Sequence, residues 1–168
     1  MRNRTKESHV GAAKQNTRKS SKIYNNPYQG LKPFEVYEGS LNGKDADYHA
    51  IVILNRGGNG MHCTPTARFV KKAQEYDCEV FIHYLRRDID GKIEEKYVNG
   101  KSTIYMLTLG ITEGSSFCIL TKENGNRMGN DAKCSEAKKC IEALVEFVKE
   151  LNNKKEFNKD GLSLETRL

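Results

Sequence analysis

His62 is the residue whose type and position best suit covalent chemistry, because it lies between the glycine-rich loop 57–60 and the start of a predicted helix. The first N–H groups of a helix have no partner inside it, and with the helix dipole they favour an anion. A phosphoryl group carried on the imidazole would therefore be stabilised there. Pro65 suits the first turn and leaves the N–H groups of Cys63 and Thr64 free as donors. The alternative is a histidine that only caps the helix or packs.

Ser102 is the second candidate, since it follows Asn99-Gly100-Lys101 at the predicted start of a short helix. We expect its hydroxyl to cap that helix by accepting a hydrogen bond from an exposed N–H. Gly100-Lys101-Ser102 also matches the end of a P-loop. Glu95 stands where that motif needs its first glycine, which argues against nucleotide binding.

The cysteines show no Cys-x-x-Cys pair, and they are read most simply as free thiols in a reducing compartment. No pair of ligands has the short spacing that zinc requires, so we expect no metal and no other cofactor. The five cysteines are Cys63, Cys78, Cys118, Cys134 and Cys140.

The elements that position these residues are predicted in the order β-α-β-β-α-β-α. Apolar periodicity indicates the strands and helices, and the turn at 88–91 indicates a hairpin. Asn99-Gly100 and Gly110 bracket the short helix. In chain order we expect a strand over 48–55, a helix after His62, strands over 80–85 and 92–98, the short helix, a strand over 116–121 and a helix over about 131–151.

Two segments resemble the motifs of the HPr family, the histidine-containing phosphocarriers of the bacterial sugar phosphotransferase system. The strand ending in Asn55 leads to Gly60-Met-His-Cys-Thr-Pro-Thr66, where the family has Gly-Leu-His-Ala-Arg-Pro-Ala. Lys101-Ser-Thr-Ile-Tyr-Met-Leu-Thr-Leu-Gly110 matches the family's Lys-Ser-Ile-Met-Gly-Val-Met-Ser-Leu-Gly. The resemblance spans roughly residues 48 to 152. It implies an α+β fold, an open-faced β-sandwich with three helices on one face of an antiparallel four-stranded sheet and water on the other.

The resemblance also implies a function. A cytoplasmic phosphocarrier of this family accepts a phosphoryl group on the residue matching His62 from a phosphoenolpyruvate-dependent Enzyme I and passes it to sugar-specific IIA proteins. The family further implies regulatory phosphorylation of Ser102 by an HPr kinase/phosphorylase, and a docking patch that includes Ile104 and Leu107. From spacing alone, these two apolar residues fit a buried core position equally well.

Thr64 is the most serious departure from the family pattern, because the family has an arginine there that contacts the phosphoryl group. A hydroxyl donates one hydrogen bond but lacks the charge and the fork of a guanidinium. Arg56 and Arg68 are candidates to replace it, beside the simpler interpretation that both are solvated surface residues. An alternative function is therefore a regulatory protein that signals through Ser102 with a slow or vestigial His62.

The positive charge is concentrated near the N-terminus. The whole chain has a net charge of +6, whereas residues 1 to 33 alone hold eight Lys or Arg against one Glu. Segments this polar cannot bury enough apolar surface to order, so we expect residues 1–45 to be a disordered extension whose removal leaves stability almost unchanged. A further alternative is a binding module that contacts nucleic acid or acidic surfaces through this extension.

The remaining boundaries follow from the same patterns. We expect the HPr-like domain over residues 46–152 and a polar C-terminal tail over 153–168. The mean hydropathy is −0.72, and no apolar run approaches the length of a bilayer span. We therefore expect a cytoplasmic protein with no membrane span.

Overall fold

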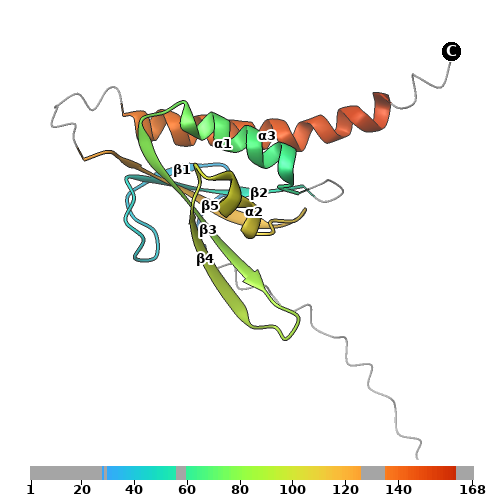
Figure 1. Ribbon diagram of the computed structural model, residues 1–168, viewed down its shortest axis with the longest axis horizontal. Coiled ribbons are helices and arrows are strands. Elements are labelled where there is room, and N and C mark those ends of the chain that lie inside the picture. The colour runs from blue at the N-terminus through green and yellow to red at the C-terminus, as the bar shows by residue number, and fades with distance from the viewer. Residues whose placement is uncertain (1–27, 29, 56–59, 126–134, 162–168) are drawn as a thin grey trace, which may run out of the picture.

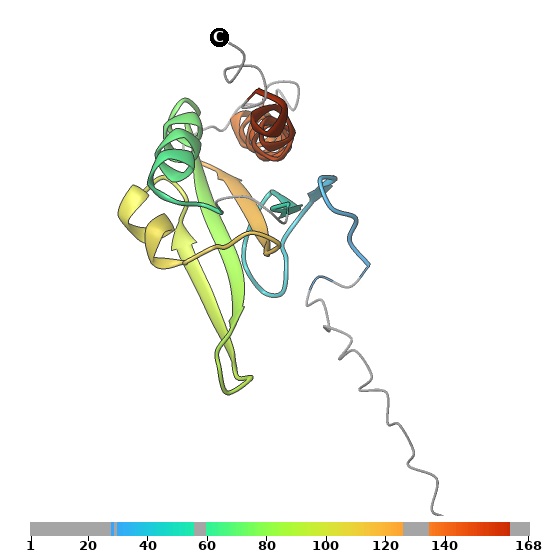
Figure 2. The same ribbon diagram turned by 90° about the vertical axis from the view of Figure 1, so that its right-hand side faces the viewer.

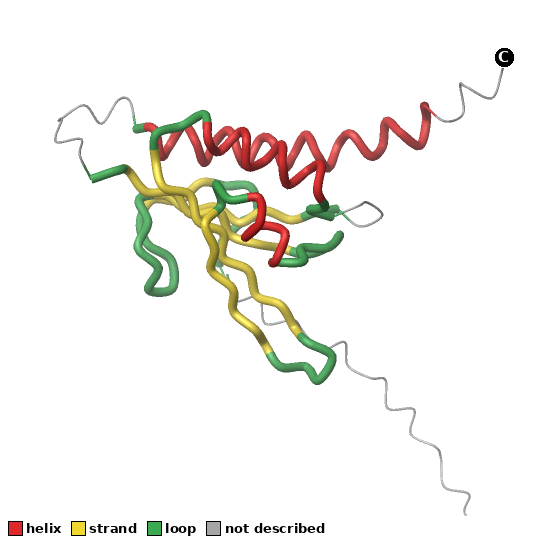
Figure 3. The backbone as a smooth tube through the Cα atoms, in the orientation of Figure 1, coloured by secondary structure: helices red, strands yellow, loops and turns green. Residues whose placement is uncertain are grey.

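The computed structural model describes residues 28, 30–55, 60–125 and 135–161 (Figure 1). In this part of the chain, five strands form one antiparallel sheet in the order β1-β2-β5-β3-β4. The helices lie on one face of it (Figure 2). In chain order the elements are β1 Val36–Glu38, β2 Tyr48–Ile53, α1 Cys63–Gln74, β3 Cys78–Arg87, β4 Ile93–Asn99, α2 Thr103–Thr108, β5 Ser116–Glu123 and α3 Glu136–Gly161 (Figure 3).

The predicted fold is confirmed, because the run from β2 to α3 has the expected β-α-β-β-α-β-α order. The sheet nevertheless has five strands rather than four. The additional strand, β1, pairs antiparallel with β2 and places Val36 opposite Ala50. It is only three residues long. A strand of that length gives no measurable period, which explains why the sequence did not reveal it.

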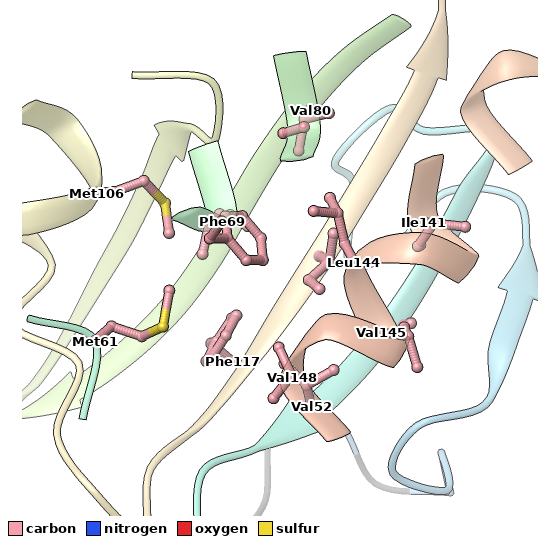
Figure 4. Packing of buried hydrophobic residues seen from close by; sticks show 14 of the residues in the cluster. Val52, Met61, Phe69, Val80, Met106, Phe117, Ile141, Leu144, Val145 and Val148 are labelled. Carbon is pink, nitrogen blue, oxygen red and sulfur yellow. The ribbon is translucent and has the colours of Figure 1, made fainter. Parts of the chain in front are cut away.

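The main core lies between the sheet and the helices. Phe69 of α1, Phe117 of β5 and Leu144 of α3 are fully buried there. Figure 4 shows side chains from these elements pointing toward one another, with Met61 and Met106 at the margin of the group. Burial of such side chains from sequentially distant elements is the main force that holds the helices on the sheet.

The opposite face of the sheet is also covered, which the sequence did not predict. We call Tyr28 together with residues 30–46 the N-terminal strap. Its buried Tyr28 and Ala46 join Ile51, Cys118 and Leu120 in a second apolar cluster on that face. The open face that we expected is therefore closed over the central strands. The expectation of disorder to residue 45 also differs from the structure, in which the strap packs on the sheet; residues 1–27 lie outside the described residues.

This double cover explains the continuous apolar run in β2. Ala50 and Val52 belong to the cluster under the helices, whereas Ile51 belongs to the cluster under the strap. Successive strand residues point to opposite faces, so a strand buried on both faces loses the apolar and polar alternation.

The last helix differs from the expectation at its C-terminal end. α3 extends to Gly161, ten residues beyond the predicted end at Leu151, and so includes part of the expected polar tail over 153–168. Lys and Glu are good helix formers, and no Gly or Pro interrupts the segment before Gly161. The predicted start at 131–134 lies outside the described residues. Among the helices described, none is long and apolar enough to cross a bilayer.

Candidate functional site

His62 is exposed at the N-terminal end of α1, as its position in the sequence predicted. Its backbone is extended, with φ −76° and ψ −170°, and its side chain makes no capping hydrogen bond. The first helical hydrogen bond runs from the Thr66 N–H to the His62 carbonyl, at 2.9 Å. The N–H groups of Cys63 and Thr64 therefore precede the helical ladder, and Pro65 has none. No acidic side chain occupies the first turn of α1, so the end of the helix stays favourable for an anion.

Hydrogen bonds to Met61 fix the segment that carries His62. The Met61 N–H donates to the Ile111 carbonyl at 3.0 Å, and the buried Thr66 hydroxyl donates to the Met61 carbonyl at 2.9 Å. Gly60 lies so close to the 111–113 loop that a Cβ there would come within 2.7 Å of the Ile111 oxygen, and its φ is +59°. Only glycine fits both demands. The loop after α2 thus fixes the approach to the imidazole.

Asn152 of α3 holds the other end of the same connection, at the C-terminal end of β2. This side chain is only 7% exposed. Its Nδ2 donates to the Ile53 carbonyl at 2.8 Å, and its Oδ1 accepts from the Asn55 N–H at 3.0 Å. Sequence reasoning missed this clamp, because nothing except its place just beyond an apolar stripe distinguishes Asn152 from a surface asparagine.

The predicted phosphoryl ligands differ in their position and contacts. Cys63 and Thr64 are exposed beside His62 on the first turn. The guanidinium of Arg68 instead lies over the ring of Phe147 on α3, 5.7 Å from its centroid, which is a cation–π distance. Arg56 lies outside the described residues. The described cation nearest in sequence to His62 is thus engaged with another helix.

Ser102 occupies the N-cap position of α2, but the prediction that its hydroxyl caps the helix is wrong. Its backbone accepts from the Met106 N–H at 3.0 Å, while the side chain makes no capping bond. Lys101 does more here than the sequence suggested. Its Nζ donates to the Tyr76 carbonyl at 2.6 Å just beyond α1, and its carbonyl accepts from Gln74 at 3.1 Å. These contacts join the start of α2 to the end of α1.

His62 and Ser102 therefore lie at opposite ends of α1. That helix has 12 residues, which gives a length of about 18 Å. A charge on Ser102 would be more than one Debye length of about 8 Å from the imidazole. Any effect of such a charge on His62 must pass through a bound partner rather than act directly across the surface.

The exposed face of α2 connects the two ends. Ile104, Tyr105 and Leu107 are 76%, 56% and 39% exposed, whereas Met106 is buried. Of the two interpretations of Ile104 and Leu107, burial favours the surface patch over the core position. Large apolar side chains gathered on one exposed helix face mark an interaction site more often than scattered ones do.

The other described histidines are buried away from this surface. The His49 Nδ1–H donates to the Gly39 carbonyl at 2.7 Å. His83 lies between Tyr28 of the strap, at 3.0 Å, and Glu95 of β4, at 2.9 Å. The hydrogen bond from His83, assisted by Lys44 at 3.3 Å, holds the pKa of Glu95 below its usual value.

The buried thiols lie in different environments. The hydrogen bond between Cys78 and Cys140 lowers the pKa of Cys78 and raises the pKa of Cys140. Burial raises the pKa of Cys118 to about 12, so it remains a neutral thiol in the strap-side cluster. Among the described residues, no group of three or more His, Cys, Asp or Glu side chains could hold a metal ion.

The chain is similar in sequence to known phosphocarrier proteins. Residues 50–150 match the family described as PTS HPr component phosphorylation site. The phosphocarrier protein HPr of Borreliella burgdorferi is 33% identical over 88 residues, which are 52% of this chain and 87% of that protein. The HPr-like protein Crh of Halalkalibacterium halodurans is 32% identical over 53% of this chain and 82% of that protein. The crystal structure of HPr from Bacillus anthracis is 28% identical, with a TM-score of 0.42 over 59% of this chain and 93% of that one.

Proposed function

This chain belongs to the HPr family and is a phosphocarrier or an HPr-like regulatory protein; within that choice, we propose a phosphocarrier that is phosphorylated on His62. The phosphoryl group comes from a phosphoenolpyruvate-dependent Enzyme I and passes to sugar-specific IIA proteins. The observation that carries the proposal is the exposed imidazole at the N-terminal end of α1, beside N–H groups that no helical carbonyl accepts.

The chemistry needs few protein groups. A neutral ring nitrogen of His62 attacks the phosphorus of the donor, and the donor's bond to the phosphoryl group breaks as the new bond forms. The N–H groups of Cys63 and Thr64 then stabilise the phosphoryl oxygens at the helix end. Because the clamps at Met61 and Asn152 hold both ends of the preceding connection, the imidazole is oriented before the partner arrives.

Thr64 should make this carrier slow. A guanidinium would provide two parallel charged hydrogen bonds to the phosphoryl group, whereas a threonine hydroxyl provides one neutral bond. Arg68 is held over Phe147 and is poorly disposed to compensate. We therefore expect Thr64→Arg to raise the rate of phosphoryl exchange by about tenfold, the equivalent of one additional hydrogen bond of roughly 1.4 kcal/mol.

Ser102 provides the second candidate function, regulation. The favouring observation is that its hydroxyl is not used for capping and lies next to the exposed side chains of α2. A phosphate there would have to be desolvated against an apolar partner surface, which weakens docking. Because Ser102 and His62 lie at opposite ends of α1, a phosphate on Ser102 would act on partner binding and leave the intrinsic reactivity of His62 unchanged.

The decisive experiment is incubation with Enzyme I and labelled phosphoenolpyruvate. We expect acid-labile label on the wild-type chain and none on His62→Ala. The matched control is His9→Ala, since the two remaining histidines, His49 and His83, are buried. Acid-labile label that persists without His62 would refute the assignment.

The same assay separates the carrier from the regulator. Transfer from Enzyme I to the chain and onward to a IIA protein supports the carrier. A chain that stays unlabelled with Enzyme I yet is phosphorylated on Ser102 by an HPr kinase would be the regulatory protein. Label on Ser102 differs from label on His62 because phosphoserine is stable in acid. Ser102→Ala should remove this acid-stable label.

A further inference from the structure

Among the residues that the structure describes, no strand pairs with the outer edge of β4, and this edge carries an unusual charge pattern. β4 is the last strand of the sheet, and its hairpin with β3 projects beyond α2 (Figure 2). The hairpin carries two exposed isoleucines, Ile89 at the tip and Ile93 at the start of β4, which is 54% exposed. Free edges with apolar residues are templates for pairing with another strand.

The hydrogen-bond pattern identifies the residues that present their backbone to this edge. The Asp88 N–H donates to the Lys92 carbonyl at 2.9 Å, and the Gly100 N–H donates to the Val80 carbonyl at 2.8 Å. Pairs alternate along an antiparallel ladder, so Glu94, Lys96 and Val98 bond to β3. The N–H and C=O groups of Ile93, Glu95 and Tyr97 consequently point outward, away from β3.

We propose that β4 pairs antiparallel with β4 of a second copy of this chain, about a two-fold axis at Glu95. This register sets Ile93 of one copy opposite Tyr97 of the other, and Glu95 opposite its equivalent. The outward backbone groups of all three residues then bond across the interface. The two sheets become one continuous sheet, in which the copies bury the same surface, as two-fold symmetry requires.

The side chains on the helix face select the register. Centred on Glu95, each copy sets Glu94 opposite Lys96 of the other, which gives two cross-strand pairs of opposite charge. Within one chain these two side chains already lie 3.8 Å apart. A register centred on Glu94 or on Lys96 instead sets that residue against its own copy and brings like charges together. Charged residues commonly protect a sheet edge from pairing. Here they permit one partner strand, the edge itself.

On the strap face, this register sets the two Glu95 side chains opposite each other, which is unfavourable because both are negatively charged. Each is already matched by its own cation, because Lys44 lies 3.3 Å away and His83 hydrogen-bonds to it. The interface spans a single strand per copy and is therefore smaller than those of stable dimers, which bury at least 1,200 Å² in general. We expect a weak dimer that dissociates on dilution.

Charge exchange tests the proposal on the full-length chain by sedimentation equilibrium over a concentration series. Wild type should dimerise, and Glu94→Lys or Lys96→Glu should each raise the dissociation constant about tenfold by turning both attractive pairs into repulsive ones. The double variant Glu94→Lys/Lys96→Glu should dimerise again. A mixture of the two single variants should form the heterodimer, since its pairs are again opposite in charge.

Three results would overturn the proposal: a wild-type chain that is monomeric at every concentration, single variants that dimerise as wild type does, or a mixture that fails to associate. Lys96 also donates to the Thr108 carbonyl at 3.2 Å, so circular dichroism must show that Lys96→Glu is folded. Glu94→Lys carries the test independently, because the described contact of its side chain is the ion pair with Lys96.

Cross-linking locates the two-fold axis. Opposed residues of an antiparallel pair lie about 5.5 Å apart at Cα, within the range that a disulfide spans. The background for this test is Cys63→Ser/Cys134→Ser, which removes the exposed thiol of the described residues and the thiol that lies outside them. In that background, Glu95→Cys should give a covalent dimer on treatment with diamide. Glu79→Cys, an exposed position on β3, is the matched control and should remain monomeric. Equal cross-linking of both variants would refute the register.

Discussion

The two faces of the sheet are closed by different kinds of contact. Under the helices, the core is a large apolar cluster with side chains from α1, α2, α3 and the strands. Under the strap, a smaller apolar cluster lies beside the polar chain from Tyr28 through His83 to Glu95. Apolar burial changes little with pH, whereas hydrogen bonds to ionisable groups depend on it. In this sheet, contacts on the helix face therefore depend little on pH, whereas contacts on the strap face respond to protonation.

Removal of residues 1–45 should have the largest effect and would show that the strap is part of the fold. The deletion removes the fully buried Tyr28, and loss of one buried aromatic side chain alone costs about 3 to 5 kcal/mol. We expect a clear fall in the midpoint of urea unfolding. Removal of residues 1–27 is the control, since it keeps every contact described for the strap. Equal midpoints for the two deletions would mean that the strap contributes nothing.

A matched pair of leucines compares the faces directly. Leu144 under the helices and Leu120 under the strap are both fully buried. Substitution of a buried leucine by alanine costs about 2 to 5 kcal/mol, depending on how far the surroundings collapse. We expect Leu144→Ala near the upper end and Leu120→Ala near the lower end, because a short strap relaxes more easily than two helices. The reverse order in chemical denaturation would contradict this picture.

The strap's polar chain is tested by Tyr28→Phe. The variant keeps the ring but removes the hydroxyl that lies 3.0 Å from the His83 Nδ1 and 3.1 Å from the His83 carbonyl. We expect a loss of about 1 to 2 kcal/mol, because a buried partner is left unsatisfied. Tyr37→Phe is the control, since its hydroxyl bonds at the surface. Similar losses for both variants would show that burial of the network adds nothing.

The smallest effect concerns pH. The pKa of Glu95 is depressed in the folded chain by the hydrogen bond from His83 and by Lys44. Its contribution to stability is therefore present above the unfolded pKa of about 4.3 and is lost as the pH falls through the lower, folded value. Glu95→Gln should flatten the acid side of the stability profile below about pH 4.5. Glu38→Gln serves as the exposed control, and an unchanged acid limb in Glu95→Gln would refute the link.

The sequence predicted the elements that are long enough to show a helical or strand period in their apolar residues. Phe69, Val70 and Ala73 recur at helical spacing and predicted the helix after His62, in which all three are buried. The apolar run of β2 predicted a buried strand but did not indicate which segments cover its two faces. The strap has neither signal, because three-residue β1 and isolated apolar residues such as Tyr28 and Leu41 carry no period. Its order comes from tertiary contacts alone.

The site divides in the same way. His62 was identifiable because glycine, histidine and proline each have a local role at a helix start. Lys101 and Asn152 were not, since their bonds reach the carbonyls of Tyr76 and Ile53 from elsewhere in the sequence. Ser102 shows the opposite error: its residue type and position favour a cap, yet the hydroxyl does not make the bond.

The side-chain amide of Asn152 is also a natural spectroscopic probe. Both of its polar atoms are bonded to backbone groups, one to Ile53 at the end of β2 and one to Asn55 two residues beyond it, and the side chain is buried. In a nitrogen-15 NMR spectrum, this NH₂ group should give resonances that exchange slowly with solvent, unlike those of the neighbouring exposed Asn153. Since Asn55 leads directly into the His62 connection, arrival of a phosphoryl group should shift these signals. The end of α3 thereby reports the state of the imidazole without an attached reporter group.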